Sequence, residues 1–403
     1  MTKNTRLHTE VDLLGTATFA DGPPHEIFDA LRAEEPVYGQ PNPMGGTAWS
    51  LTRFADIRAV GTDMEKFTST EGMHYPNIRE HAKYKCDNIM FNDPPVHTRL
   101  RTFAAKAFSA PVVAKFEVWI RELCVEIVED VLRQDRIDII PAIASALPGQ
   151  VIARVMGVPD HERSLIIKWA NDIFGRLDPA IGMERSIAAV RECEEYAFVL
   201  RDRKLKEPGV DMATELAHAS RGGMGITDNE YKEMVSALII AGYETTHTLV
   251  AQSLVLMAID PNVRRQVEST PAGQMGPVVE ELLRYTCPVM HMGRTAKVDF
   301  ELHGKSISKG DFVLMWYSAA NRDPAVFDDP HVFNCSRPRV NHASFGGGGP
   351  HLCMGAHLAR LEVQILLEEM NKRQLRLELD GDPERSVGVF INALRRVPMR
   401  VVK

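Results

Sequence analysis

The stretch ASFGGGGPHLCMGAHLARLE, residues 343–362, is the most informative part of the chain. Four consecutive glycines precede a cysteine, and the residues after the cysteine have helical spacing. Because glycines lack side chains and tolerate unusual backbone angles, such a loop can pass very close to a flat or bulky group. We therefore expect the chain to hold Cys353 against a bound group at the start of a helix.

Several kinds of cysteine site can be compared with this pattern. A phosphatase-type nucleophile needs arginine six residues after the cysteine, where this chain has Ala359, and a Walker-type loop needs GK[ST] where it has PHL. His351, Cys353 and His357 could bind zinc, although they supply only three ligands and no fourth is nearby. The other interpretation is a thiolate that ligates haem iron at a helix N-terminus, where backbone N–H groups and the helix dipole favour the anion.

Length and composition indicate one large globular unit over residues 1–403, with an extended N-terminal segment at 1–23. No linker, charge block or repeat divides the 403 residues, of which 44% are hydrophobic and 25% charged, with a formal net charge of -7. This composition argues against a nucleic-acid partner. The N-terminus has no apolar run long enough for a signal peptide or membrane anchor, so we expect a cytoplasmic protein without a membrane contact.

The periodicity of apolar residues predicts a mainly α protein with a small β region. Helices are expected at 93–108, 112–133, 182–206 and 227–259. Strands are expected at 48–52, in a hairpin over 300–307 that turns at His303 and Gly304, and at 312–318.

The helix at 227–259 is the longest. Thr227 and Glu230 form a capping box, and Asp260 with Pro261 ends the pattern. At about 1.5 Å per residue the helix is roughly 48 Å long, enough to cross the molecule. Its middle is apolar on nearly every side, so we expect it to be buried. The segment GYETTHT interrupts the apolar residues, which argues against a membrane span.

The polar interruption of this helix is unusual. Gly242 costs about 1 kcal/mol relative to alanine in a helix interior, and Glu244 and Thr245 put an acid and a hydroxyl in a buried stretch. Thr245 can bond back to the carbonyl of Ala241 and open the local ladder. The result could be a groove for a small ligand that needs protons, or only a helix kink with Glu244 paired to a distant base.

A third motif is EELLRY, in which Glu281 and Arg284 lie three residues apart on one helical face. Such a pair is usually a solvated surface feature. Downstream, the segment that ends in FNCSRP carries Arg337, which could join the pair as a buried triad. Such a triad would fix the loop that leads to Cys353.

Taken in order, AGYETT, ELLR, FNCSRP and FGGGGPHLCMG resemble the cytochrome P450 family, from about residue 24 to the C-terminus. The resemblance implies a triangular helical prism with a small β-rich corner. It also implies haem b (iron protoporphyrin IX) between the long helix and the helix after Cys353, with Cys353 as the axial thiolate. One departure is the spacing from Phe345 to Cys353, which is eight steps instead of the common seven. It leaves open which glycine packs on the porphyrin.

The resemblance also implies cationic partners for the two haem propionates. His97 and Arg101 are four residues apart and therefore share a helix face. Arg294 and His351 match the other propionate-binding positions of the family, and Phe345 belongs to the same haem environment.

The implied activity is a monooxygenase that inserts one atom of O2 into a C–H bond of a small hydrophobic substrate. Gly242 would leave room for dioxygen, Thr245 would donate a hydrogen bond to it, and Glu244 would belong to the proton route. Ferredoxin and a ferredoxin reductase would supply electrons from NAD(P)H. A haem-thiolate protein that only binds ligands and a peroxide-driven peroxygenase are alternatives, against which Glu244 and Thr245 argue.

The family's pocket-forming segments predict an apolar substrate pocket, flexible where methionine lines it. Its expected residues are Met73, Ile89, Phe91, Ile240, Ala241, Val289, Met290, Phe390 and Ile391. A terpenoid, branched alkyl or steroid side chain fits such a pocket, with a small aromatic compound as the alternative. His291 could anchor a carboxylate.

Helical geometry also predicts a docking surface for the ferredoxin. Arg99 and Lys106 lie roughly 180° to 200° from His97 around the helix and should point outward, near Arg360. Together they would form a basic patch on an acidic protein.

Overall fold

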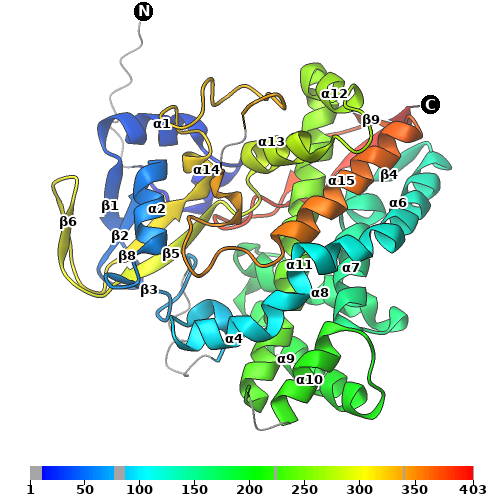
Figure 1. The fold of residues 1–403 in the computed structure, drawn as a ribbon. Helices are drawn as coiled ribbons and strands as arrows, with labels where there is room; N and C mark the ends of the chain where they lie inside the picture. Colours follow the sequence, from blue (N-terminus) through cyan, green and yellow to red (C-terminus); the bar gives the residue numbers. More distant parts are fainter. Residues whose placement is uncertain (1–10, 77–86, 222–224, 339–340, 403) are drawn as a thin grey trace, which may run out of the picture.

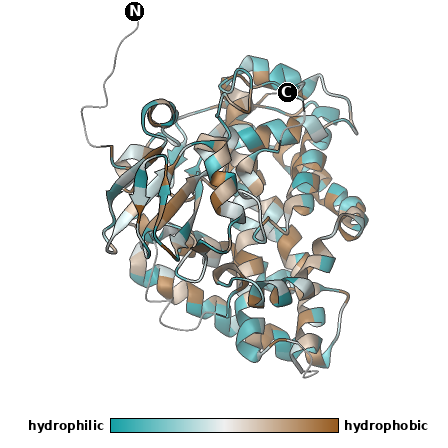
Figure 2. Cartoon of the chain, turned by 60° about the vertical axis from the view of Figure 1, so that its left-hand side comes forward, coloured by the Kyte–Doolittle hydropathy of each residue, from teal (hydrophilic) through white to brown (hydrophobic). Residues whose placement is uncertain are grey.

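The computed structural model describes residues 11–76, 87–221, 225–338 and 341–402. Figure 1 shows a β-rich part beside a larger helical part, with the long α11 running through the helices. The prediction of a mainly α protein with a small β region is confirmed. In Figure 2 hydrophobic residues line the inward faces of the helices and hydrophilic residues the outward faces, as expected for amphipathic helices around a core.

Helices make up most of the described chain. Those longer than one turn are α1 (His25–Glu34), α2 (Phe54–Thr62), α4 (Val96–Ala105), α6 (Glu117–Leu132), α7 (Ala146–Met156), α8 (Arg163–Phe174), α9 (Gly182–Lys206), α10 (Met212–Arg221), α11 (Asp228–Ile259), α12 (Pro261–Glu268), α13 (Gly276–Thr286) and α15 (Ala356–Lys372). Short helical turns are α5 (Ala110–Val113), α14 (Tyr317–Ala320), η2 (Ile89–Phe91), η3 (Lys106–Phe108), η4 (Ala114–Phe116), η5 (Ile140–Ala144), η7 (Gly175–Leu177) and η8 (Ala343–Phe345).

The β-rich part is built on one mixed sheet in the order β1-β2-β8-β5-β3. Its strands are β1 (Val37–Pro41), β2 (Thr47–Leu51), β8 (Phe312–Trp316), β5 (His291–Ala296) and β3 (Phe67–Thr68). Only β2 and β8 are parallel in this sheet, which brings the N-terminal part of the chain beside residues near 314.

The remaining strands form three small sheets. They are β4 (Arg136–Asp138) with β12 (Pro398–Val402) and β9 (Arg376–Leu379), the hairpin β6 (Phe300–Leu302) and β7 (Lys305–Ile307), and the pair β10 (Glu384–Arg385) and β11 (Leu394–Arg396). The predicted hairpin is confirmed, and both turn residues, His303 and Gly304, have positive φ angles.

The long helix is confirmed with both of its predicted ends. Thr227 and Glu230 form the capping box, and Asp260 caps the next helix, α12, through the backbone N–H of Asn262 and Val263. The helix contacts α7, α8 and α9, and most of its residues are buried. Because α11 passes through the core, the side chains in its middle contact either other parts of the protein or a cavity.

Three boundaries differ from the sequence predictions. The predicted helix 112–133 is divided into α5, η4 and α6, because the chain turns through a tighter helical turn at η4. The predicted strand 312–318 ends at Trp316, where α14 begins. Asp93 does not cap a helix with its side chain; its carboxylate accepts hydrogen bonds from Thr68 Oγ1 (2.5 Å) and Ser69 N (2.9 Å).

Candidate active site

A central cavity of about 240 Å³ lies between α11 and the glycine-rich loop before α15. Its walls come from α4, α11, β5, η2 and the loop over residues 344–355. Thr245 lines it from α11, and Cys353 lines it from the glycine-rich loop. Segments far apart in the sequence therefore bring a hydroxyl and a thiol to one cavity.

The predicted cationic side chains gather on this cavity. His97, Arg101, Arg294 and His351 all line it, and the rings of His97 and His351 are 4.2 Å apart between centroids. Arg294 is buried, its Nη1 donates to the carbonyl of Gly293 (2.7 Å), and its Nε has no partner. Arg101 donates to the carbonyl of Leu352 (2.6 Å).

Neither arginine forms an ion pair with a carboxylate in the described part of the chain. Burial and the neighbouring arginines lower the pKa of His97, and burial with the charges of Arg294, His97 and Arg101 lowers the pKa of His351 to about 2. Buried cations without acidic partners are costly, so the site is built to receive anions. The two propionates of the expected haem fit these residues.

The backbone around Cys353 holds its sulfur at the cavity. The Cys353 N–H donates to the carbonyl of Phe345 (2.9 Å), and α15 begins three residues later, at Ala356. Burial raises the pKa of the Cys353 thiol, while the N–H of Gly355 and the charges of Arg101 and Arg360 act in the opposite direction. These groups are the ones that would stabilise a thiolate, as an iron ligand requires.

The four glycines lie between the cavity and α2. Gly346 and Gly348 line the cavity, and a side chain at Gly348 would lie 3.1 Å from Thr62 of α2. A side chain at Gly347 would lie 3.0 Å from the carbonyl of Ile57, and one at Gly349 would overlap the backbone of Gly61. The loop therefore needs glycine on one side for the bound group and on the other for contact with α2.

The α11 wall carries the predicted acid and hydroxyl positions. Thr245 Oγ1 donates to the carbonyl of Ala241 (2.8 Å), so the back-bond expected from the sequence is present. Both residues and Gly242 line the central cavity. A side chain at Gly242 would lie 2.6 Å from Ile152 of α7, which gives this glycine a helix-packing role in addition to the predicted one.

Glu244 lies on a different side of α11 from Thr245. It is buried and lines a second cavity of about 250 Å³, together with His247. Its Oε1 is 3.7 Å from His247 Nδ1, and its Oε2 has no partner. Of the two alternatives considered above, pairing of Glu244 with a distant base is not observed among the described residues, because its basic neighbour, His247, is one helical turn away. The i,i+3 spacing of Glu244 and His247 was the signal for this partner.

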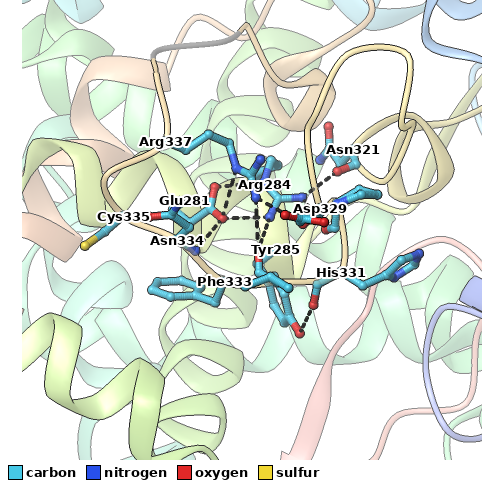
Figure 3. Close-up of polar contacts among 12 residues, drawn as sticks. Glu281, Arg284, Tyr285, Asn321, Asp329, His331, Phe333, Asn334, Cys335 and Arg337 are labelled. Atoms are coloured by element: carbon cyan, nitrogen blue, oxygen red, sulfur yellow. Dashed lines mark hydrogen bonds and ion pairs between the residues drawn. The ribbon is translucent and has the colours of Figure 1, made fainter.

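Figure 3 shows how the predicted triad connects α13 to the segment before the glycine-rich loop. Arg284 donates to both oxygens of Glu281 (2.7 and 2.8 Å), and Arg337 Nε lies 3.4 Å from Glu281 Oε1. All three side chains are buried or nearly so, unlike a solvated surface pair.

Backbone carbonyls complete this network. Arg284 also donates to the carbonyls of Asn321 and Pro330 (both 2.8 Å), and the N–H of Asn334 donates to Glu281 (2.9 Å). Ser344, one residue before Phe345, donates to the carbonyl of Leu283 (2.7 Å). The network therefore fixes the loop over 321–338 and extends to the start of the Cys353 loop.

Six of the predicted substrate residues line one of the two cavities, and three line neither. Met73, Ile89, Ala241 and Val289 line the central cavity, and Phe390 and Ile391 line the second cavity. The prediction was wrong for Phe91, Ile240 and Met290, which line neither.

The three misplaced residues turn toward other neighbours. Met290 packs in the core beside Trp316, and Met292, two residues later, faces the cavity instead. Phe91 contacts the ring of His74, and Ile240 packs on the helical core. The apolar lining residues that sequence reasoning missed include Met90, Ala237, Leu238 and Met292.

His291 does not serve as a carboxylate anchor. It is buried, its Nε2 accepts the N–H of Tyr75 (3.0 Å), and its Nδ1 lies 2.9 Å from the carbonyl of Val389. Burial lowers the pKa of His291 to about 3. Both ring nitrogens are used to hold backbone, so the ring is neutral and has no donor left for a ligand.

The predicted basic patch is largely neutralised. Arg99 is bonded to Glu230 and to the carbonyl of Gly225, and Arg360 donates to Glu280 Oε2 (2.9 Å). The prediction that Arg99 is free for a partner was wrong, because the N-terminal turn of α11 lies against it. Lys106 is exposed and has no ion pair in the described part of the chain.

Two further alternatives can be compared with the structure. Among the described residues, no group of three His, Cys, Asp or Glu side chains is arranged to hold a metal ion, so His351, Cys353 and His357 do not form the zinc site considered above. No helix within the described ranges has both the length and the apolar composition that a membrane crossing requires.

Comparisons with known proteins agree with this geometry. A family model described as Cytochrome P450 matches residues 275–384. The chain is 30% identical over 389 residues to a methyl-branched lipid omega-hydroxylase of Mycobacterium tuberculosis, which covers 92% of this chain and 90% of the relative. It is also 30% identical over 396 residues to a steroid C26-monooxygenase of the same species, and this match covers 95% of this chain and 91% of the relative.

Solved structures give the same result. Mycobacterium marinum cytochrome P450 CYP268A2 in complex with pseudoionone superposes with a TM-score of 0.90 at 28% identity, over 98% of this chain and 100% of that one.

Proposed function

Because the chain belongs to the cytochrome P450 family, we propose that it hydroxylates a branched alkyl chain or a steroid side chain. It is a haem b monooxygenase that uses redox partners and O2 on a hydrophobic substrate. When bound, the haem activates O2, so that one oxygen atom enters a C–H bond and the other leaves as water. Two electrons and two protons balance the reaction.

The observation that carries this proposal is that Thr245 and Cys353 line one cavity. Apart from Thr246, the rest of the α11 wall of this cavity is apolar. When haem is bound, Cys353 would ligate the iron, and His97, Arg101, Arg294 and His351 would bind the propionates. Thr245 Oγ1 donates to the Ala241 carbonyl, and its hydroxyl would turn from that carbonyl to donate a hydrogen bond where dioxygen binds. Gly242 keeps the adjacent turn of α11 free of a side chain.

Glu244 and His247 form the proton route. Both are buried, both line the second cavity, and Glu244 precedes Thr245 in the chain. The Glu244 carboxylate has an oxygen without a partner, and neither ring nitrogen of His247 has a hydrogen-bond partner. These groups can take protons from water in the second cavity and pass them across α11 toward Thr245.

The substrate class rests on the cavity lining and the relatives together. Met73, Met90 and Met292 supply flexible apolar contacts that fit a branched chain. The relatives are named for methyl-branched lipids and for steroid C26. Both names describe chemistry at a branched alkyl end.

The electron donor is a ferredoxin with its reductase in the cytoplasm. Lys106 of η3 and Lys115 of η4 are exposed, and the η3 to α5 segment contacts α15, the helix that follows Cys353. A small acidic protein is attracted to these charges on the Cys353 side.

The test is turnover of an iso-branched fatty acid and of a steroid with a branched side chain, with ferredoxin, reductase, NAD(P)H and O2. We expect hydroxylation at the branched alkyl end, with label from isotopic O2 in the product. Consumption of NAD(P)H with no labelled product from either substrate, while a small aromatic compound is hydroxylated, would overturn this substrate class.

A further inference from the structure

The second cavity holds a cation that none of the proposed steps uses. Arg176 of η7 lines it, and no hydrogen bond or ion pair joins this side chain to another described residue. Burial lowers the pKa of the Arg176 guanidinium to about 10, so the group is still charged at neutral pH. Arg176 is half-buried, so part of the hydration of its charge is lost without an ion pair to replace it.

Neither acid on this cavity forms an ion pair with Arg176. Asp178 accepts from Arg395 (3.1 Å) and from the N–H of Ala180 (2.9 Å). Glu244 lies against His247. Arg176 is therefore the cation of this cavity whose charge has no counterpart among the described residues.

The rest of the lining is apolar. Its contributors are Phe174, Leu177, Ile181, Val389, Phe390 and Leu394. A ligand that suits both features has an apolar body and an anionic end, and a planar guanidinium pairs with a carboxylate through two parallel hydrogen bonds.

The second cavity adjoins the central one. Met73 lines the central cavity and His74 the second, and the same division occurs between Thr245 and Glu244. An isolated β-bridge joins Val289 of one lining to Ile391 of the other. The walls of the two cavities are therefore contiguous, although their linings share no residue.

We propose that Arg176 binds the carboxylate of the substrate, which is a long branched aliphatic or steroid acid whose other end lies in the central cavity. This inference rests on the proposed function and adds the chemical class of the substrate's distant end. Arg176 is a specificity-determining residue, and it takes no part in oxygen chemistry.

The test compares isopalmitic acid with its uncharged methyl ester as ligands of the holoenzyme, by calorimetry and by the Soret shift. We expect the parent protein to bind the acid at least about tenfold more tightly than the ester. Arg176→Gln should weaken binding of the acid by about 10 to 100-fold and leave the ester within about twofold. Arg176→Lys should retain part of the preference.

Arg185→Gln is the matched control, because Arg185 lies outside the cavity and pairs with Asp172 and Glu192. It should bind both ligands as the parent does. Equal affinity of the parent protein for acid and ester would overturn the proposal. So would an equal loss for both ligands in Arg176→Gln, the result expected if Arg176 paired with Glu244 in solution.

The outcome for the proposed function is separate. Hydroxylation of the methyl ester by Arg176→Gln supports the monooxygenase assignment whether or not the anchor exists. Absence of product from both ligands in the parent protein would argue against the substrate class, while the binding preference would still test Arg176.

Discussion

Cys353 illustrates how far single residues could be read from the sequence. Four glycines before a cysteine and a helix after it are local signals, so they predict the loop without any knowledge of the fold. The role of the cysteine as an iron ligand came from the resemblance to the family. The neighbours that tune this cysteine, Arg101 and Arg360, come from α4 and α15. The close contacts of Gly347, Gly348 and Gly349 are made with α2, which no local pattern could show.

Replacing the iron ligand is the first prediction at this scale. Cys353→His should abolish the red-shifted absorption of the reduced, CO-bound haem, because imidazole donates less electron density to iron than thiolate does. The reduced CO spectrum measures this directly. Cys335→Ser is the control, since Cys335 lies outside the cavity, and it should keep the parent spectrum. A parent-like spectrum in Cys353→His would contradict the assignment.

The second residue-scale prediction concerns Thr245. Thr245→Ala should still bind substrate and consume NAD(P)H, but product per electron should fall on the order of tenfold as peroxide is released. Peroxide and product are quantified together. Thr248→Ala is the matched control because Thr248 is buried on the same helix and lines neither cavity. If both variants couple electrons to product as the parent does, Thr245 has another role.

At the scale of elements, the predictions were strong where a signal lies within one segment. The capping box and terminal Asp-Pro of α11 defined that helix from Thr227 to Asp260. Strand β5 was missed because nearly all of its residues are buried, which leaves no alternation of polar and apolar positions. Arg99 was misjudged for a related reason: helix geometry gives the direction of a side chain, but Glu230 comes from a helix 131 residues further on.

The Glu281 network of Figure 3 gives the element-scale prediction. Arg284→Met should destabilise the fold by about 3 to 5 kcal/mol, because it removes the main partner of a buried carboxylate. Haem retained per protein should fall, since the network extends to the Cys353 loop. Thermal unfolding and haem content are the measurements.

The control for this variant is Arg376→Met. Arg376 forms a more exposed ion pair with Glu268, and such pairs contribute about 0 to 1 kcal/mol. We expect it to unfold and to retain haem nearly as the parent does. If Arg284→Met matched Arg376→Met in both measurements, the network would not support the haem loop.

At the scale of the whole molecule, the surface charge matters more than any one ion pair. The chain carries a formal charge of -7, yet Lys106 lies in η3, which contacts the helix that follows Cys353, and Lys115 lies in η4, which contacts α5. Their attraction for an acidic partner is screened beyond roughly 10 Å at about 0.1 M salt. The encounter rate should therefore depend on ionic strength.

Charge reversal tests this surface. The double variant Lys106→Glu and Lys115→Glu should slow reduction by ferredoxin by roughly tenfold or more at low salt and flatten its salt dependence, with haem content unchanged. Lys309→Glu, an exposed lysine just beyond β7, is the control. Stopped-flow reduction measures the rate. An unchanged rate in the double variant would show that ferredoxin docks on another face.

The two adjoining cavities have one more consequence if Arg176 holds the acid end of the substrate. The protein then acts as a ruler that measures the chain from its carboxyl group. Lengthening a fatty acid by one methylene should leave the oxidised carbon at the same number from the carboxyl and move it one carbon away from the terminal methyl. Arg176→Gln should erase this register, so that the products spread over neighbouring carbons.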